Sequence, residues 1–462
     1  MNSLITALAN GVQDAGCTHF ANYPGFHSNE LHAALGAEVT SSDEKNAFAF
    51  AWGCSMAGER AMVSFKNVGL NDAADAFLGA LFVGCRAGLV LVLFDDCDIQ
   101  HSQSRIDVRP YFLIYGGLWL EPRSVLEAYT LTKQAFELSE RFRLPVVIRI
   151  TNILYDMGLR PICLERSPIA HREFGPLERR PDISRYVVHP SEAWRMEREL
   201  AEKNKAVEAF VESLYDDQPG PCSPEIICGA KRNALAAHPF RIFTLPVPRN
   251  ALRSRFADLP LPGLTVYEHG GSPFMRDRIA AALAGDPPAA RMMTPPGNFK
   301  SKYHNHDFME RLFAPLREVP DNLICGDLGG FTMDPHRTLH LCLCYGVSPA
   351  VAMGAAEACR RKANVFCVTG DAAFLHSGQQ CLYEMIERNV SVSVFVLENG
   401  GAQGTGGQYI AGDLKKVPGH VNFYELNYPE CSQAELRNFV AKLPLSAVNL
   451  IVVHTHENEG GK

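Results

Sequence analysis

An α/β fold built on parallel sheets is predicted by the way apolar runs alternate along this chain. Short β-branched runs alternate with segments of helical period over roughly residues 1–155, and the same alternation returns after residue 300. Polar residues directly follow several of the apolar runs, as they do at the carboxyl edge of a doubly wound sheet. We therefore expect two doubly wound α/β domains that flank a smaller α/β segment in the chain.

The first region begins with a helix, because Leu4, Ile5, Leu8 and Val12 follow helical spacing. The expected strands of this region are residues 18–22, 38–40, 62–65, 88–94 and 145–150. The expected helices between them are residues 30–35, 45–57, 72–82 and 124–141.

Two changes in composition divide the remainder of the chain. A stretch rich in proline and arginine at 161–185 predicts a domain connection, and a second shift at 286–300 predicts a boundary. Between them we expect a charged helix at 192–215 and strands at 225–228 and 264–267. After the second shift, the expected strands are 323–325, 365–369, 391–397 and 449–454. This organisation predicts domains at 1–160, 161–288 and 289–462.

The composition is that of an ordinary globular chain and favours a small partner. The 462 residues are 47% hydrophobic and 21% charged, with a net charge of −7 and no basic block, which argues against nucleic acid or an anionic membrane as partner. The longest apolar runs, such as 87–94, are far shorter than the roughly 20 residues that a membrane span requires. The N-terminus shows no export signal, so we expect a cytoplasmic protein.

The 14 cysteines are scattered, and the chain contains no CxxC motif. The closest pair, Cys342 and Cys344, is separated by one residue. This spacing argues against zinc and iron–sulfur sites and favours buried thiols in a reducing compartment.

Polar residues at two strand ends of the last domain predict a magnesium site. Gly370-Asp371 ends one apolar run and Asn399-Gly400-Gly401 ends a later one, and the carboxyl ends of parallel strands share one edge. A carboxylate, an amide oxygen and a backbone carbonyl suit Mg²⁺ bound to a diphosphate. The glycines of the segment 326–330, GDLGG, would let backbone N–H groups approach a phosphate or ring closely.

These motifs resemble a known family. The segments GDAAFLHSG (370–378) and LENGGAQGTGGQ (397–408) are similar to the diphosphate-binding motif of thiamine-diphosphate enzymes, especially the large subunit of indolepyruvate ferredoxin oxidoreductase. In the first domain, residues 22–31, 41–75 and 95–109 resemble the pyrimidine-binding half of that subunit. The resemblance implies a pyrimidine-binding domain at 1–160 and a diphosphate-binding domain at 289–462.

The resemblance also implies roles for individual residues. Asp371, Asn399 and the backbone carbonyl of Gly401 would bind Mg²⁺. The residues implied in binding thiamine diphosphate are Gly326, Asp327, Gly329, Tyr345, Gly370, Asp371, Asn71 and Gln408. His101 and His376 are candidates for proton transfer, because imidazole titrates near neutrality.

Glu44 is the expected catalytic centre. Ser41 or Ser42 can cap a helix that begins there, and residues 47–52 provide an apolar wall that should raise the carboxyl pKa. By resemblance, this glutamate would share a proton with N1′ of the cofactor aminopyrimidine. Without the resemblance, Glu44 would be taken as a solvated first-turn residue that the helix dipole favours.

Arg105 and Arg109 are candidates for gripping a substrate carboxylate with two hydrogen bonds. Ion pairing at the protein surface is the simpler interpretation of either arginine. Phe26, Phe48 and Trp52 make an aromatic or bulky substrate side chain conceivable.

The sequence departs from the family in four features. It lacks the cysteine-rich cluster motifs of the ferredoxin oxidoreductase subunit, and the stretch MMTPPGNFK (292–300) replaces a CPGC-type segment. Phe26-His27 replaces the small residues of a PGTP-like turn. Tyr345 stands where relatives carry an aliphatic or methionine residue that supports the bent cofactor.

We therefore expect Mg²⁺- and thiamine-diphosphate-dependent, non-oxidative decarboxylation of a 2-oxo acid to an aldehyde. The alternatives are carboligation or acyl transfer, and an oxidoreductase subunit that uses a separate electron carrier. A non-catalytic assembly subunit is disfavoured because Glu44, Asp371 and Asn399 are present. The resemblance implies at least a homodimer, with Glu44 of one chain meeting Asp371 of another.

Overall fold

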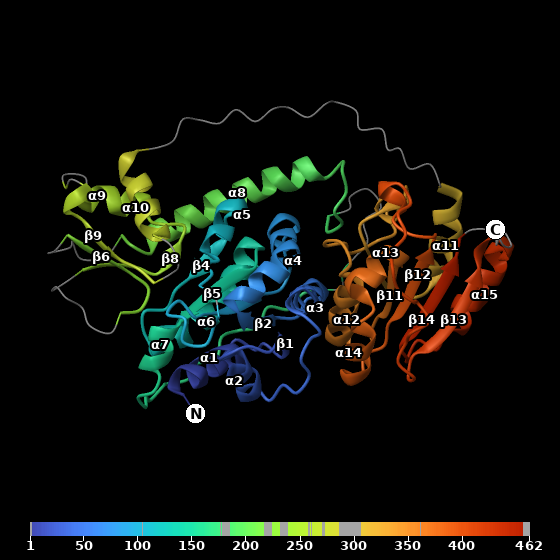
Figure 1. Cartoon of the computed structure of the whole chain (residues 1–462), viewed down its shortest axis with the longest axis horizontal. Coiled ribbons are helices and arrows are strands. Elements are labelled where there is room, and N and C mark those ends of the chain that lie inside the picture. Colours follow the sequence, from blue (N-terminus) through green and yellow to red (C-terminus); the bar gives the residue numbers. More distant parts are fainter. Residues whose placement is uncertain are drawn as a thin grey trace.

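The computed structural model describes residues 2–103, 105–175, 177, 185–216, 224–231, 239–256, 259, 261–269, 273–285, 306–360 and 362–455. These residues form three sheets with helices on their faces. The first domain lies between the middle domain and the last domain (Figure 1). The two domains that are widely separated in the chain are therefore neighbours in space.

The first sheet has six strands in the order β1-β2-β3-β5-β4-β8, and every pairing except β4–β8 is parallel. Its strands are β1 (His19–Asn22), β2 (Ala61–Lys66), β3 (Leu89–Asp95), β4 (Leu118–Leu120), β5 (Val146–Thr151) and β8 (Thr244–Leu245). Its helices are α1 (Ser3–Asp14), α2 (Ser28–Ala34), α3 (Glu44–Ala57), α4 (Leu70–Val83), α5 (Phe112–Tyr115), α6 (Val125–Phe142) and α7 (Asn152–Met157). Strand β3 is buried along its whole length, which explains its continuous apolar sequence.

The last sheet is fully parallel and has the order β10-β11-β12-β14-β13. Its strands are β10 (Asn322–Gly326), β11 (Asn364–Gly370), β12 (Ser393–Glu398), β13 (Asn422–Asn427) and β14 (Asn449–His454). The helices are α11 (His306–Glu318), α12 (Ser348–Cys359), α13 (Asp371–Ala373), α14 (Cys381–Glu387) and α15 (Gln433–Lys442). Each loop that follows a strand therefore emerges at the same edge, where ligands bind in such sheets.

One part of the middle segment forms a small sheet of its own, and the other part packs on the first domain. A small parallel sheet, β7-β6-β9, packs with α9 (Arg249–Phe256) and α10 (Phe274–Ala284). Its strands are β6 (Glu225–Cys228), β7 (Phe240–Ile242) and β9 (Thr265–Tyr267). In contrast, α8 (Ala193–Ser213) lies on α4 and α6 of the first domain, and β8 completes the first sheet (Figure 1). Chain order alone does not show this division.

Glycines allow the first and last domains to pack closely through α3 and α12, which lie side by side (Figure 1). A Cβ on Gly53 would lie 2.2 Å from the Val351 carbonyl oxygen, and one on Gly354 would lie 2.0 Å from the Phe50 carbonyl oxygen. The two helix backbones are therefore in contact at this crossing, and no larger residue fits without movement.

Most expected elements are present, with three differences. Residues 38–40 form no strand, because three residues without a pairing partner make no ladder. The strands β4, β7, β8 and β13 were missed, and the boundary predicted at 286–300 lies outside the described residues. Among the described residues, no helix is long and apolar enough to cross a membrane.

Candidate active site

Asp371 and the loop 399–401 come together at the carboxyl edge of the last sheet. Asp371 follows β11 directly, is 6% exposed, and accepts hydrogen bonds at Oδ2 from the backbone N–H groups of Asn399 (3.2 Å) and Gly401 (3.0 Å). A Cβ on Gly401 would lie 2.2 Å from the Gln408 carbonyl oxygen, and its φ is 128°, so only glycine suits this position. The predicted metal-binding residues therefore lie together.

The donor set at this edge fits a hard cation. It combines the Asp371 carboxylate, the Asn399 side chain and the Gly401 backbone, which are the ligand types that Mg²⁺ prefers beside a diphosphate. A cavity of about 190 Å³ opens next to them, and Asp371, Gly401 and Lys415 are among its lining residues. The residues present thus fit a Mg²⁺-diphosphate group.

Asp327 holds a loop rather than facing the cavity. Its carboxylate is fully buried and accepts hydrogen bonds from the backbone N–H of Gly346 (2.8 Å) and the hydroxyl of Ser348 (2.8 Å). Burial raises the pKa of this carboxyl, and the hydrogen bonds oppose that rise. Gly346, with φ 83°, directly follows Tyr345, so Asp327 fixes the backbone beside Tyr345.

Glu44 is the first residue of α3, and its carboxyl lies against Gly69. A Cβ on Gly69 would lie 2.3 Å from Glu44 Oε1, so glycine at 69 makes room for the carboxyl. Burial raises the pKa of Glu44, and the nearby carboxylates of Asp72 and Asp43 raise it further. The helix cap is Asp43, whose side chain accepts from the Asn46 N–H at 2.6 Å, and not a serine as predicted. The direction of this shift is the one expected for Glu44 from the apolar wall that follows it.

The N-terminus of α3 contacts the last domain of the same chain. The Lys45 ammonium donates to the Tyr345 carbonyl oxygen (2.9 Å), and the Asn46 side chain donates to the Ser377 carbonyl oxygen (3.0 Å). The His376 ring packs edge-on against the Tyr345 ring, with centroids 5.4 Å apart. The residues that follow Glu44 therefore contact Tyr345 and Ser377 within one chain. The contact expected between Glu44 of one chain and Asp371 of another stays a prediction.

Other predicted residues lie farther out on loops. Asn71 accepts a hydrogen bond from the Tyr111 hydroxyl (2.9 Å), and His101 stacks on Phe26 with ring centroids 3.5 Å apart. Gln408 is exposed and bonds to Thr405 in its own loop. The glycines 326, 329 and 370 end or follow strands β10 and β11 at the same edge as Asp371.

The two arginine candidates differ. Arg105 is exposed, as a substrate clamp or a surface ion pair would be. Arg109 is fully buried and bonds to Asp107 (2.6 Å) and Glu268 (2.8 Å), so both interpretations of this residue are wrong. The guanidinium instead joins the first domain to the middle domain, because Glu268 follows β9.

Sequence reasoning missed Lys45, and it also missed His454 at the cavity beside Asp371. His454 ends β14 opposite Glu398 of β12, and its imidazole bonds to the carboxylates of Glu398 and Glu425. The strand-end rule that identified Asn399 also applies to His454. No comparable pattern pointed to Lys45, because its partner Tyr345 is 300 positions away.

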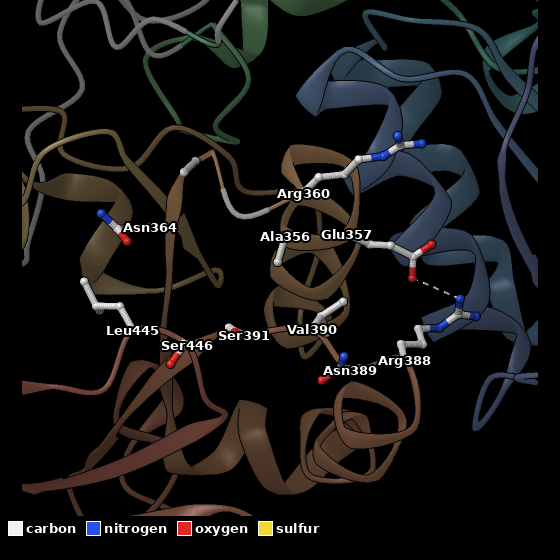
Figure 2. Close-up of a pocket in the computed structure, with 11 residues that line it drawn as sticks. Ala356, Glu357, Arg360, Asn364, Arg388, Asn389, Val390, Ser391, Leu445 and Ser446 are labelled. Atoms are coloured by element: carbon white, nitrogen blue, oxygen red, sulfur yellow. Dashed lines mark hydrogen bonds and ion pairs between the residues drawn. The ribbon is translucent and has the colours of Figure 1, made fainter.

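A larger cavity lies elsewhere. It measures about 700 Å³ and is lined by residues at the start of β11 and before β12 and β14, including Asn364, Ser391 and Ser446 (Figure 2). The ion pair between Arg388 and Glu357 borders it at 3.2 Å (Figure 2). This is the amino edge of the sheet, opposite to the edge that carries Asp371.

Residues 327–440 match the family model of the thiamine pyrophosphate enzyme C-terminal TPP-binding domain. The chain is 27% identical to indolepyruvate oxidoreductase subunit IorA of Archaeoglobus fulgidus, over 87% of this chain and 75% of the relative. It is also 27% identical to that subunit of Thermococcus kodakarensis, over 85% and 73% of the two chains.

Two solved structures share the fold. The thiamine diphosphate-dependent 4-hydroxybenzoylformate decarboxylase from Rhodococcus jostii aligns over 99% of this chain and all of its own, with a TM-score of 0.53 at 14% identity. Benzoylformate decarboxylase from Polynucleobacter necessarius aligns over 98% of both chains, with a TM-score of 0.52 at 13% identity. The predicted α/β fold is thereby confirmed.

Proposed function

We propose that this chain, which carries a C-terminal thiamine pyrophosphate-binding domain and is homologous to IorA subunits over most of its length, oxidises a 2-oxo acid. The electrons would pass to a separate carrier. The observation that carries this proposal is the similarity to subunits named indolepyruvate oxidoreductase, which spans 87% of the chain. A 2-oxo acid with an aromatic side chain is the substrate class that this name suggests.

The last domain would hold the diphosphate. Asp371, Asn399 and the Gly401 carbonyl would bind Mg²⁺, and the backbone at Gly326, Gly329 and Gly370 lies at the same edge of the sheet. Asn71 and Gln408 remain proposed cofactor contacts. Thiamine diphosphate, when bound, supplies the carbon nucleophile that attacks the keto group and accepts electrons as CO₂ leaves.

Glu44 would hold a proton at N1′ of the aminopyrimidine ring. The raised pKa of its carboxyl supports this role, because a protonated carboxyl can donate to a ring nitrogen and take the proton back. Tyr345 would support the cofactor from the other side, since its backbone is held by Lys45 and its ring contacts His376. His376, whose ring contacts Tyr345, would move protons near the reacting carbon, and His101 is the second candidate.

Non-oxidative decarboxylation to an aldehyde is the second candidate function. It is favoured by one observation: among the described residues, the one group of three or more His, Cys, Asp or Glu side chains close enough to share a metal ion contains only one cysteine, so no iron–sulfur ligand set is assembled there. In that reaction a proton replaces the lost carboxylate, and no electron carrier is needed. Carboligation would follow if a second carbonyl compound took the place of the proton.

Product analysis separates these functions. The full chain, loaded with thiamine diphosphate and Mg²⁺, is incubated with indolepyruvate, benzoylformate and pyruvate, with and without a viologen dye and coenzyme A. Oxidation predicts two electrons delivered to the dye for each CO₂ released and no aldehyde. Aldehyde equal to CO₂ without dye reduction would establish the decarboxylase instead, and incorporation of an added aldehyde would establish carboligation. Absence of CO₂ from every substrate, with no calorimetric binding of the cofactor, would overturn the proposal.

A further inference from the structure

Three potential metal ligands meet where the first domain faces the middle domain. Cys97 and Asp98 follow β3, and His269 follows β9. One ligand atom of each residue lies within 4.8 Å of the others. Cys97 is buried, His269 is half-buried and Asp98 is exposed, so solvent reaches the group at Asp98.

Backbone polar groups face two of these side chains: that of Asn152 faces the Cys97 thiol, and that of Ala230 faces the His269 imidazole. Metal-binding imidazoles characteristically give their other ring nitrogen to a backbone carbonyl or carboxylate, which fixes the tautomer and the ring orientation. The backbone of Ala230 is in position for this role at His269.

The charges around the group favour a cation. Two buried guanidiniums lie near the group, and each is paired with two carboxylates. The four negative charges exceed the two positive charges. These pairs are Arg149 with Asp95 (2.6 Å) and Glu121 (3.0 Å), and Arg109 with Asp107 (2.6 Å) and Glu268 (2.8 Å). Asp98 adds another negative charge at the open side.

We propose that Cys97, Asp98 and His269 bind a Zn²⁺ ion that joins the first domain to the middle domain. A thiolate, an imidazole and a carboxylate suit Zn²⁺, whereas Mg²⁺ avoids sulfur. Ligand atoms on one tetrahedral Zn²⁺ lie roughly 3.3–3.8 Å apart, so small side-chain movements close the site. The thiol proton is released to solvent on binding, and water takes the fourth position on the exposed side.

Zinc at this place would also order a loop of the candidate active site. The Asp96 carboxylate accepts hydrogen bonds from the backbone N–H groups of Gln100 (2.8 Å) and His101 (2.7 Å) and from the Ser102 hydroxyl (2.7 Å). Cys97 and Asp98 therefore form the base of the loop that positions His101. A metal bound there restrains this loop without contacting the cofactor.

Cobalt and zinc binding test the site on the full chain. Co²⁺ added to chelator-treated protein should give a thiolate-to-cobalt charge-transfer band at one equivalent, and Zn²⁺ should displace the band. The Cys97→Ala variant should lose the band, and His269→Gln should weaken Zn²⁺ affinity at least tenfold. The matched control Cys163→Ser removes an exposed cysteine outside the group and should change neither.

Two results would overturn the proposal: a wild-type protein without the band, or a band that survives in Cys97→Ala. If Cys97→Ala fails to fold, Asp98→Asn and His269→Gln decide, because both change side chains that are not fully buried. Unchanged Zn²⁺ affinity in both of these variants would then exclude the site. All of these outcomes are measured as metal binding and not as turnover. The zinc proposal can therefore fail while the proposed oxidation of a 2-oxo acid holds, and the reverse.

Discussion

The Lys45 ammonium donates a hydrogen bond to the backbone carbonyl of Tyr345 at 2.9 Å, which ties the helix that begins with Glu44 to the loop that follows β10 and its helical turn. The same ammonium lies 3.0 Å from Asp75 of the first domain. Lys45 therefore joins two domains directly beside the candidate active site. We expect its replacement to weaken cofactor binding at that site.

Lys45→Met should weaken thiamine diphosphate binding about tenfold, because a hydrogen bond from a charged donor contributes about 1.5–3 kcal/mol and part of it supports the Tyr345 loop. Isothermal titration calorimetry measures this change. Lys205→Met is the control, since Lys205 pairs with Glu202 at 2.8 Å on an exposed face of α8. Equal cofactor affinity in Lys45→Met and the parent would show that the Tyr345 loop does not need this hydrogen bond to support cofactor binding.

Glu44→Gln should keep cofactor binding but slow turnover by about 10²-fold or more, the typical effect of losing a positioned acid–base group. The amide matches the carboxyl in size, yet it cannot pass a proton to N1′. Exchange of the cofactor C2 proton with deuterated solvent, followed by quenched-flow NMR, isolates this step. Exchange as fast as in the parent would remove Glu44 from its proposed role.

Asp371→Asn should lower thiamine diphosphate affinity at least tenfold, and a chelator should release the cofactor from the parent protein, because the diphosphate charge is held through Mg²⁺. Asp413→Asn serves as the control, since Asp413 lines the same cavity but is outside the proposed ligand set. Calorimetry should show that the thiamine diphosphate affinity of the parent rises with the Mg²⁺ concentration. In Asp371→Asn the affinity should no longer depend on Mg²⁺. A variant that retains this dependence would contradict the assignment.

Gly354→Ala should lower the free energy of unfolding by about 1–3 kcal/mol, the usual cost of inserting a methyl group into a packed interior. The added Cβ would lie 2.0 Å from the Phe50 carbonyl oxygen, so α3 and α12 must separate. Gly419→Ala should cost far less, because nothing lies within 4 Å of the corresponding Cβ. Urea denaturation compares the two variants, and equal losses would argue against backbone contact at this crossing.

Asp107→Asn should destabilise the protein by about 2–3 kcal/mol at pH 7, because it removes the charged hydrogen bonds of Asp107 to the buried Arg109 guanidinium and leaves Glu268 as the remaining carboxylate partner. Burial opposes ionisation of Asp107, but hydrogen bonds from Arg109 outweigh it and lower its pKa to about 2, against about 3.9 in the unfolded chain. The stabilisation is thus fully present above about pH 4 and is lost as the pH falls through 2.

Chemical denaturation between pH 7 and pH 2 should therefore show the parent and Asp107→Asn converging at the acid end. The exposed pair Arg276–Asp277, at 3.0 Å, provides the control variant Asp277→Asn, which should cost no more than about 1 kcal/mol at any pH. A constant difference between the parent and Asp107→Asn across this range would show that ionisation of Asp107 does not stabilise the fold.

Much of the last domain was predictable from sequence because its signals are local. The apolar run 365–369 and the Gly370-Asp371 that follows it predict both a buried strand and its ligand-binding end, and β11 and Asp371 lie there. In contrast, β13 is only partly buried at the sheet edge, so its sequence lacks a continuous apolar run and was missed.

The site residues divide in the same way. Glu44, Asp371 and Asn399 could be proposed from sequence motifs, because each lies in a short segment with its own pattern. The burial of Arg109 and the group formed by Cys97 and His269 depend on contacts between domains, which no local pattern reports. The lack of CxxC spacing excluded metal sites built from neighbouring residues, but not one assembled from two domains.

The sequence by itself determined the α/β class, the strand ends that carry polar residues and the motif that resembles thiamine-diphosphate enzymes, because periodicity and strand-end chemistry are properties of short segments. Only the tertiary structure decided that the N-terminus of α3 reaches Tyr345 and Ser377 of the same chain. It also decided that α8 and β8 belong with the first domain. These contacts join residues far apart in the sequence, and close packing of whole domains, rather than local propensity, selects them.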